Sequence, residues 1–279
     1  MNSSIILSFI TFIYFASFMS YLLMLVMGKS FLGRIGTWIS LIGMIIHGAA
    51  IILRWMESYW LGIGHAPLSN LYESLAFFSW TIVLLYQLVE WRTKNRTLGA
   101  FVMPLAFLAL AYASFSPHIS SQIQPLIPAL QSNWLITHVI TCFLGYAAFA
   151  ISFSLSIMYL LKGVDNKVKS SSLTKHIPKQ GVLDDLNYQM VVIGFLMLTL
   201  GIITGSVWAH SAWGSYWSWD PKETWSLITW LIYAAVLHSR MVRGWRGKRI
   251  SILCLIGFGC VLFTYFGVNY LPGLHSYGK

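Results

Sequence analysis

Charge is scarce in this chain of 279 residues. Asp, Glu, Lys and Arg together make up 9% of the chain, and only 8 residues are acidic, whereas 57% of the residues are hydrophobic. A soluble domain of this length cannot bury so much apolar surface. The composition therefore excludes a soluble domain and predicts a protein that crosses a membrane several times.

Cysteine and clustered histidine are scarce as well. The three cysteines, Cys142, Cys254 and Cys260, all lie in apolar runs, and no Cys-x-x-Cys-His segment occurs, which excludes a cytochrome with covalently attached haem. No two histidines lie within five residues of one another, a spacing that disfavours a zinc site. The sequence also lacks a phosphate-binding glycine loop and any distinctive Ser/His/Asp arrangement.

What is present is a series of long apolar runs. The first is too long for a signal peptide and has no basic segment before it, so it is predicted to be a retained span. We expect an all-α, polytopic transmembrane helical bundle of about eight spans, forming a single membrane-embedded domain over residues 1–279. The predicted spans cover residues 4–27, 35–55, 71–91, 98–115, 134–161, 188–208, 222–241 and 250–271.

The basic residues predict how the bundle is oriented. Of the 18 Lys and Arg, 15 follow the first, third, fifth or seventh span. Cytoplasmic loops carry such an excess, so both termini are predicted to face outward. The net charge of +10 then reflects topology and not nucleic-acid binding. The 15 residues are Lys29, Arg34, Arg92, Lys94, Arg96, Lys162, Lys167, Lys169, Lys175, Lys179, Arg240, Arg243, Arg246, Lys248 and Arg249.

Residues 208–225 form the most unusual stretch, with five Trp, one Tyr and one His separated by small residues. One interpretation is an aromatic belt at the membrane surface, where indole rings find both apolar and polar surroundings. The stretch ends in Asp220, Pro221 and Glu223, which together are typical of a helix start. Asn70 and Glu73 predict a second capped start, for the third span.

Two histidines are predicted to lie at the depth of this stretch. His138 lies one turn inside the fifth span, and His275 follows the last span. Two imidazoles beside aromatic rings suit a haem, whose iron takes axial histidines, and Lys222 or Arg54 could meet its propionates. From the residues alone, two alternatives stay open: a structural aromatic belt, and a transporter with incidental histidines.

Other intramembrane residues predict packing. Gly194, Gly201 and Gly205 in the sixth span have the spacing that allows close helix contact in lipid. His47, near the middle of the second span, is either a histidine hydrogen-bonded to a neighbouring helix or, less commonly, a cofactor ligand. Arg54, at the end of the same span, is expected to extend toward the outer interface.

The run from Trp213 to Trp225 resembles the tryptophan-rich WWD signature of membrane proteins that handle haem, and most closely that of the CcsA/ResC family of the cytochrome c maturation machinery called System II. Further matches are Pro67 to Ser74, the His138 region, Leu237 to Arg240, and Gly273 to Tyr277. The resemblance covers the second to the eighth span.

The resemblance implies haem export followed by thioether attachment to the Cys-x-x-Cys-His segment of apocytochrome c, with haem b as the ligand. His138 and His275 would be its axial ligands, and His238 would help to carry haem from the cytoplasmic side. The platform that holds the haem would comprise Trp213, Trp217, Trp219 and Asp220.

The same resemblance implies partners and a location. The chain would form part of a holocytochrome c synthase with a separate ResB-like membrane subunit, and it would bind no nucleic acid. It would lie in the bacterial cytoplasmic (inner) membrane, or in the thylakoid membrane if plastid-encoded, with the WWD stretch on the outer face. The alternative within the same superfamily is a System I exporter or ligase such as CcmC or CcmF.

Overall fold

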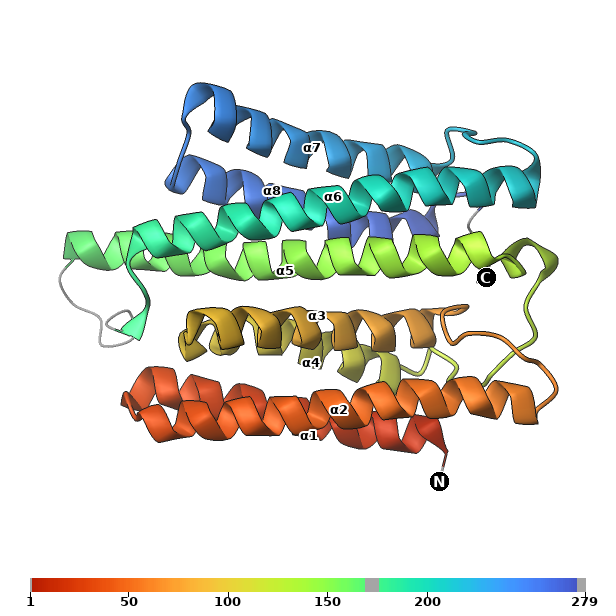
Figure 1. Ribbon diagram of the computed structural model, residues 1–279, viewed down its shortest axis with the longest axis horizontal. Helices are drawn as coiled ribbons and strands as arrows, with labels where there is room; N and C mark the ends of the chain where they lie inside the picture. The colour runs from red at the N-terminus through yellow and green to blue at the C-terminus, as the bar shows by residue number, and fades with distance from the viewer. Residues whose placement is uncertain (1, 169–175, 275–279) are drawn as a thin grey trace. The chain divides into compact units, whose positions relative to one another are not determined.

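The computed structural model describes residues 2–168 and 176–274, and every regular element in these ranges is helical. The chain forms two compact units (Figure 1). The first comprises Met1–Ile127 and Lys167–Pro178, and the second comprises Pro128–Asn166 and Lys179–Lys279. The predicted all-α class is confirmed.

The first unit contains four long helices. They are α1 (Ser3–Met27), α2 (Ser30–Trp60), α3 (Leu71–Thr93) and α4 (Gly99–Phe115), with the short turn η1 (Arg96–Leu98) before α4. Helix α1 packs against α2 and α4, and α3 packs against α2 and α4 (Figure 1). Polar side chains also join these helices: Trp80 Nε1 donates to the Met44 carbonyl at 3.1 Å, and Ser79 Oγ donates to the Ala106 carbonyl at 2.8 Å.

The second unit contains α5 (Asn133–Val168), α6 (Gln180–Trp213), α7 (Pro221–Arg243) and α8 (Lys248–Tyr265). The short turns η2 (Pro128–Leu130) and η4 (Gly267–Tyr270) precede α5 and follow α8. Helix α7 packs against α6 and α8, and the Phe149 ring of α5 stacks on Tyr233 of α7 with centroids 3.5 Å apart.

Among the described residues, seven helices are long and apolar enough to cross a membrane, a finding that supports the predicted polytopic bundle. Helix α7 is 23 residues long but carries Lys222, Glu223, Arg240 and Arg243, and it is not among the seven. The eighth crossing, the side on which the termini lie and the single-domain organisation stay predictions.

The glycines of α6 allow α5 to approach closely. An added Cβ on Gly194 would collide with the Phe149 ring, and one on Gly201 would lie 2.6 Å from Cys142 Sγ. The predicted use of small residues for helix contact is therefore confirmed within this unit.

Arg54 does not extend outward as expected from the sequence. Its side chain is only 3% exposed, and its Nε donates to Glu73 Oε1 at 2.9 Å. Its second guanidinium arm donates to the Ser121 carbonyl. A buried carboxylate therefore holds this cation inside the first unit, because an unpaired charge there would be costly.

Candidate functional site

The site is built where α6 ends and α7 begins. Asp220 caps α7 as predicted: its Oδ1 accepts from the Lys222 amide at 2.9 Å, and the Glu223 carboxylate accepts from the Asp220 amide at 3.2 Å. This reciprocal arrangement satisfies amides that the first turn of a helix leaves unpaired. The boundary between the aromatic stretch and α7 is therefore fixed by local hydrogen bonds.

The loop that carries the tryptophans is held in an unfavourable backbone conformation. Trp219 has φ of 60°, in the left-handed region that bulky residues rarely adopt. Glu223 Oε2 accepts from the amides of Ser218 and Asp220 on either side of it, and Thr224 Oγ1 donates to the Trp219 carbonyl. These bonds hold Trp219 in place against the backbone strain, a pattern that occurs at functional sites.

The loop presents aromatic surface outward. Trp219 is 69% exposed and Tyr216 is 57% exposed, while Trp213 and Trp217 are partly buried. The rings of Trp217 and Trp219 meet edge to face with centroids 5.7 Å apart. Indole rings left this accessible form an apolar surface suited to a flat ligand.

His138 of α5 is oriented by the backbone of α6. Its Nδ1 lies 2.7 Å from the Gly201 carbonyl oxygen, and because a carbonyl only accepts, Nδ1 carries the proton. In the neutral ring, Nε2 then keeps its lone pair, and it has no hydrogen-bond partner within residues 2–168 and 176–274. A histidine held in this way is prepared to bind a metal through Nε2.

Trp208 is a further candidate site residue, which the sequence alone did not single out from the aromatic stretch. Its indole lies parallel to the His138 ring, with centroids 6.0 Å apart, and meets Trp213 edge to face at 4.8 Å. Its Nε1 donates to the Ala129 carbonyl, and the side chain is 3% exposed. Trp208 thus links His138 to the aromatic stretch. Gly205 of α6 leaves room for the His138 ring, because a Cβ added at this position would lie 2.5 Å from His138 Nδ1.

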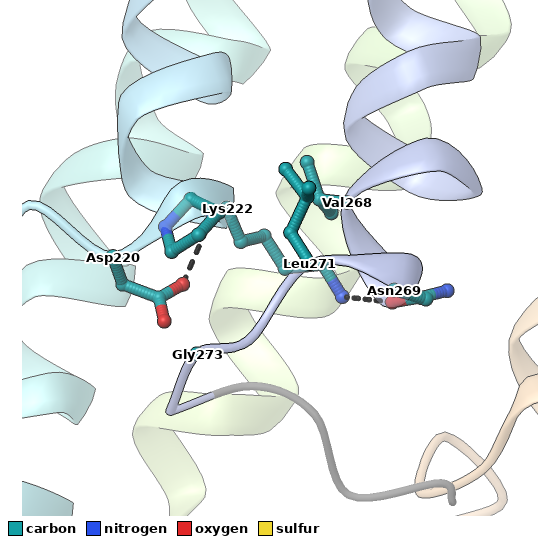
Figure 2. A pocket seen from close by; sticks show the side chains of 7 residues that line it. Asp220, Lys222, Val268, Asn269, Leu271 and Gly273 are labelled. Atoms are coloured by element: carbon teal, nitrogen blue, oxygen red, sulfur yellow. Dashed lines mark hydrogen bonds between the residues drawn. The ribbon is translucent and has the colours of Figure 1, made fainter.

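Beside the start of α7 lies a small pocket (Figure 2). Lys222 reaches across it and donates from Nζ to Asn269 Oδ1 at 3.4 Å. No carboxylate lies within salt-bridge distance of this amine in the described parts of the chain. The pocket is lined by Asp220, Pro221, Lys222, Val268, Asn269, Leu271 and Gly273.

Asp220 also binds the segment that follows η4. While Oδ1 caps α7, Oδ2 accepts from the Leu274 amide at 2.6 Å. Gly273 packs directly against this carboxylate. His275, the next residue, lies outside the described residues, so its predicted role as a ligand stays a prediction.

His238 lies near the other end of α7. It is exposed and lies 18 positions after Asp220, which corresponds to about 27 Å of helix. That length is close to the thickness of a bilayer core, about 30 Å. The structure therefore places His238 far from the Trp219 loop.

Three further histidines have partners within the protein. His47 is fully buried and its Nδ1 lies 3.1 Å from Tyr14 Oη, which confirms the interpretation as a hydrogen-bonded helix contact. Both ring nitrogens of His65 contact backbone carbonyls, and His210 stacks on Tyr216 at 4.2 Å. Among the described residues, no three His, Cys, Asp or Glu side chains are grouped closely enough to hold a metal ion.

Known proteins match most of the chain. A family described as "Cytochrome C assembly protein" matches residues 68–275. A cytochrome c biogenesis protein CcsA of Heterosigma akashiwo is 42% identical, over 84% of this chain and 83% of its own. The CcsA proteins of Pyropia yezoensis (88% of each chain) and Prochlorococcus marinus (84% of this chain, 81% of its own) are also 42% identical.

A solved structure shares the fold. The chain titled "Cytochrome c Heme Lyase CcmF" aligns with a TM-score of 0.73 at 16% identity. The alignment covers 95% of this chain but 47% of that one. The similarity at this identity concerns the helical arrangement.

Proposed function

This chain belongs to the cytochrome C assembly protein family, and from that premise we propose that it presents haem for attachment to apocytochrome c. In this proposal, His138 and His275 hold haem b on the outer face of the membrane, beside the tryptophans of residues 208–225. The attachment complex also contains a ResB-like subunit, and the chain lies in a bacterial inner membrane or a thylakoid membrane.

The observation that carries the proposal is the hydrogen bond between His138 Nδ1 and the Gly201 carbonyl oxygen. It directs the lone pair to Nε2, the nitrogen that a haem iron needs, and the Trp208 indole lies nearly parallel to the histidine ring. The indoles of Trp213, Trp217 and Trp219 follow Trp208 closely in the sequence, and they provide apolar surface for a porphyrin face.

Lys222 is the candidate partner of a haem propionate. Its amine lies in the pocket of Figure 2 with only an amide oxygen as a partner among the described residues. A carboxylate would give it a charge-assisted hydrogen bond. Arg54, the other candidate from the sequence, is bound to Glu73 and is no longer proposed.

The chemistry needs orientation more than a catalytic group. Each cysteine thiol of apocytochrome c adds across a haem vinyl group, with sulfur bonding to one carbon and the thiol hydrogen passing to the other. Both thiols come from the substrate, so the chain's part is to hold the porphyrin edge beside them, which lowers the barrier by several kcal/mol. His238, at the opposite end of α7, would contact haem on its way from the cytoplasmic side.

The proposal is tested by purifying the protein in detergent with its ResB-like subunit and measuring both haem absorption and attachment to a Cys-x-x-Cys-His reporter. We expect a low-spin haem spectrum in the wild type. His138→Ala should weaken the spectrum and the attachment, and added imidazole should restore both by replacing the missing ligand. Protein that carries no haem under haem-replete expression would favour a structural aromatic belt instead.

A further inference from the structure

Asn269 of η4 is held between a backbone carbonyl and the Lys222 amine. Its Nδ2 donates to the Tyr265 carbonyl oxygen at 3.1 Å, and its Oδ1 accepts from Lys222 Nζ at 3.4 Å. A carbonyl only accepts and an ammonium only donates, so each end of the side-chain amide faces the partner that it requires. The bond to Lys222 is longer than the usual distance of about 2.7–3.2 Å, so it is a weak one.

The surroundings of the Lys222 amine give it no opposite charge in contact. Both carboxylate oxygens of Asp220 accept from backbone amides, those of Lys222 and Leu274. Neither these oxygens nor any other carboxylate of the described residues lies within salt-bridge distance of Lys222 Nζ. Three of the residues that line the pocket are apolar: Pro221, Val268 and Leu271 (Figure 2). An ion pair formed beside such groups is stronger than one formed in water.

The same amine lies in the neighbourhood of the proposed iron ligand. Lys222 interacts electrostatically with His138 and Cys142, which are one turn apart on α5. A haem whose iron is bound by His138 carries its propionates at the edge of the porphyrin. A cation near the histidine can therefore meet one of these carboxylates.

From these contacts, we infer that Asn269 is a positioning residue that directs the Lys222 amine into the pocket and, as a neutral partner, leaves its charge available to a carboxylate of the ligand. The inference rests on the proposed function, in which Lys222 meets a haem propionate. The propionate replaces the weak bond to the amide oxygen with a charge-assisted hydrogen bond. The site thereby selects porphyrins with a free carboxylate, a selectivity that iron ligation alone does not provide.

Two substitutions test the pair. Asn269→Asp keeps the size of the side chain but sets a carboxylate beside the amine, so the charge of Lys222 is neutralised within the protein. Lys222→Met removes the amine and keeps an unbranched side chain. Asn269 is exposed, and Lys222 takes part in the cap of α7 through its backbone amide, so both variants retain the cap.

The ligands for the test are ferric haem and its dimethyl ester, in which the propionates carry no charge. The full chain is purified with its ResB-like subunit after haem-limited expression, and each ligand is titrated in detergent while the absorption of the bound form is measured. Asn2→Asp is the matched control for added negative charge, because Asn2 is exposed and its side chain makes no cap bond at the start of α1. His138→Ala tests the proposed function separately.

We expect the wild type to bind haem about tenfold more tightly than the ester, the effect of one hydrogen bond to a charged group. Asn269→Asp and Lys222→Met should each weaken haem binding to the level of the ester and leave binding of the ester unchanged. Asn2→Asp should retain the preference for haem. His138→Ala should weaken the binding of both ligands, since both present the same iron.

Three results would overturn the inference. If His138→Ala weakens binding but the wild type binds haem and the ester equally, the pocket does not recognise a carboxylate, and the proposed function stands. If Asn269→Asp keeps the preference for haem, or weakens the binding of both ligands alike, Asn269 does not act through the charge of Lys222. If His138→Ala binds both ligands like the wild type, the proposed iron ligand is wrong, and the inference fails with it.

Discussion

His138 Nδ1 and the Gly201 carbonyl oxygen lie 2.7 Å apart, a hydrogen bond from a side chain of α5 to the backbone within α6. The carbonyl accepts from the histidine ring and so selects its tautomer. Gly205, one turn further along α6, leaves the space that the ring occupies. A histidine that is oriented by the backbone and packed against a glycine has little freedom to rotate, an arrangement that favours tight metal binding in the proposed function.

Gly205→Ala should therefore disturb haem binding without removing any functional side chain. An added Cβ would lie 2.5 Å from His138 Nδ1 and 2.7 Å from Cε1, so the ring must move. We expect about a tenfold loss of bound haem, a typical effect of disturbing a residue that orients a metal ligand. Haem per protein, measured by absorbance after purification, checks this.

The control for this prediction is Gly181→Ala, at the start of the same helix, where an added Cβ meets nothing within 4 Å. It should bind haem normally, because alanine only improves the helix propensity there. Equal haem loss in both variants would mean that haem binding responds to any glycine replacement in α6, and not specifically to the contact with His138.

Trp219 should show an unusual response to glycine. Its φ of 60° costs a non-glycine residue about 1–2 kcal/mol. Both Trp219→Gly and Trp219→Ala remove the ring, but only glycine relieves the backbone, so we expect the glycine variant to be more stable by about 1 kcal/mol. Thermal unfolding in detergent compares the two.

Trp217 provides the opposite case, because its φ is not positive. There, glycine should be less stable than alanine, since it adds freedom to the unfolded chain. Should alanine be the more stable replacement at both positions, the backbone of the loop is not strained as described.

The buried pair of Arg54 and Glu73 should contribute more to stability than surface ion pairs do. Glu73 also accepts from the amide and the hydroxyl of Ser69, and its side chain is completely buried. Glu73→Gln keeps the shape but leaves the Arg54 charge without a carboxylate, at an expected cost of about 3 kcal/mol. Thermal unfolding in detergent measures this cost, and a loss of stability below about 1 kcal/mol would contradict the contribution expected of a buried ion pair.

Asp184 and Asp185 offer a matched comparison within the second unit. Asp184 accepts from Arg240 Nη1 at 2.7 Å and from the Gly247 amide at 2.8 Å, whereas Asp185 is 66% exposed and lies 3.3 Å from Arg240 Nη2. We expect Asp184→Ala to destabilise by about 3 kcal/mol. Asp185→Ala should change stability by less than about 0.5 kcal/mol. Similar losses of stability from the two substitutions would contradict the conclusion that Asp184, and not Asp185, forms the buried ion pair with Arg240.

The parts of the site that depend on neighbours in the sequence could be predicted. Asp220, Pro221 and Glu223 lie within four residues, so their capping bonds follow from helix geometry alone, and Asn70 accepts from the Glu73 amide for the same reason. The apolar runs likewise predicted the long helices, because a bilayer requires a continuous apolar length.

The parts that depend on tertiary contact could not be predicted. The second bond of Asp220 reaches Leu274, 54 residues away, and Trp208 is distinguished from its neighbours by tertiary contacts with His138 and Ala129. Arg54 was misjudged because its partner, Glu73, has a complete local explanation as a capping residue. Residue patterns report periodicity and local hydrogen bonds, and they do not report which helices meet.

The most direct test of the account is the ligand set of the iron in the purified, haem-loaded complex. Electron paramagnetic resonance of the ferric protein distinguishes low-spin haem iron with two histidine ligands from high-spin haem iron with one. We expect the two-histidine signal in the wild type. Both His138→Ala and His275→Ala should give the one-histidine signal, and added imidazole should restore the two-histidine signal in each. A two-histidine signal that persists in either variant without imidazole would contradict this expectation.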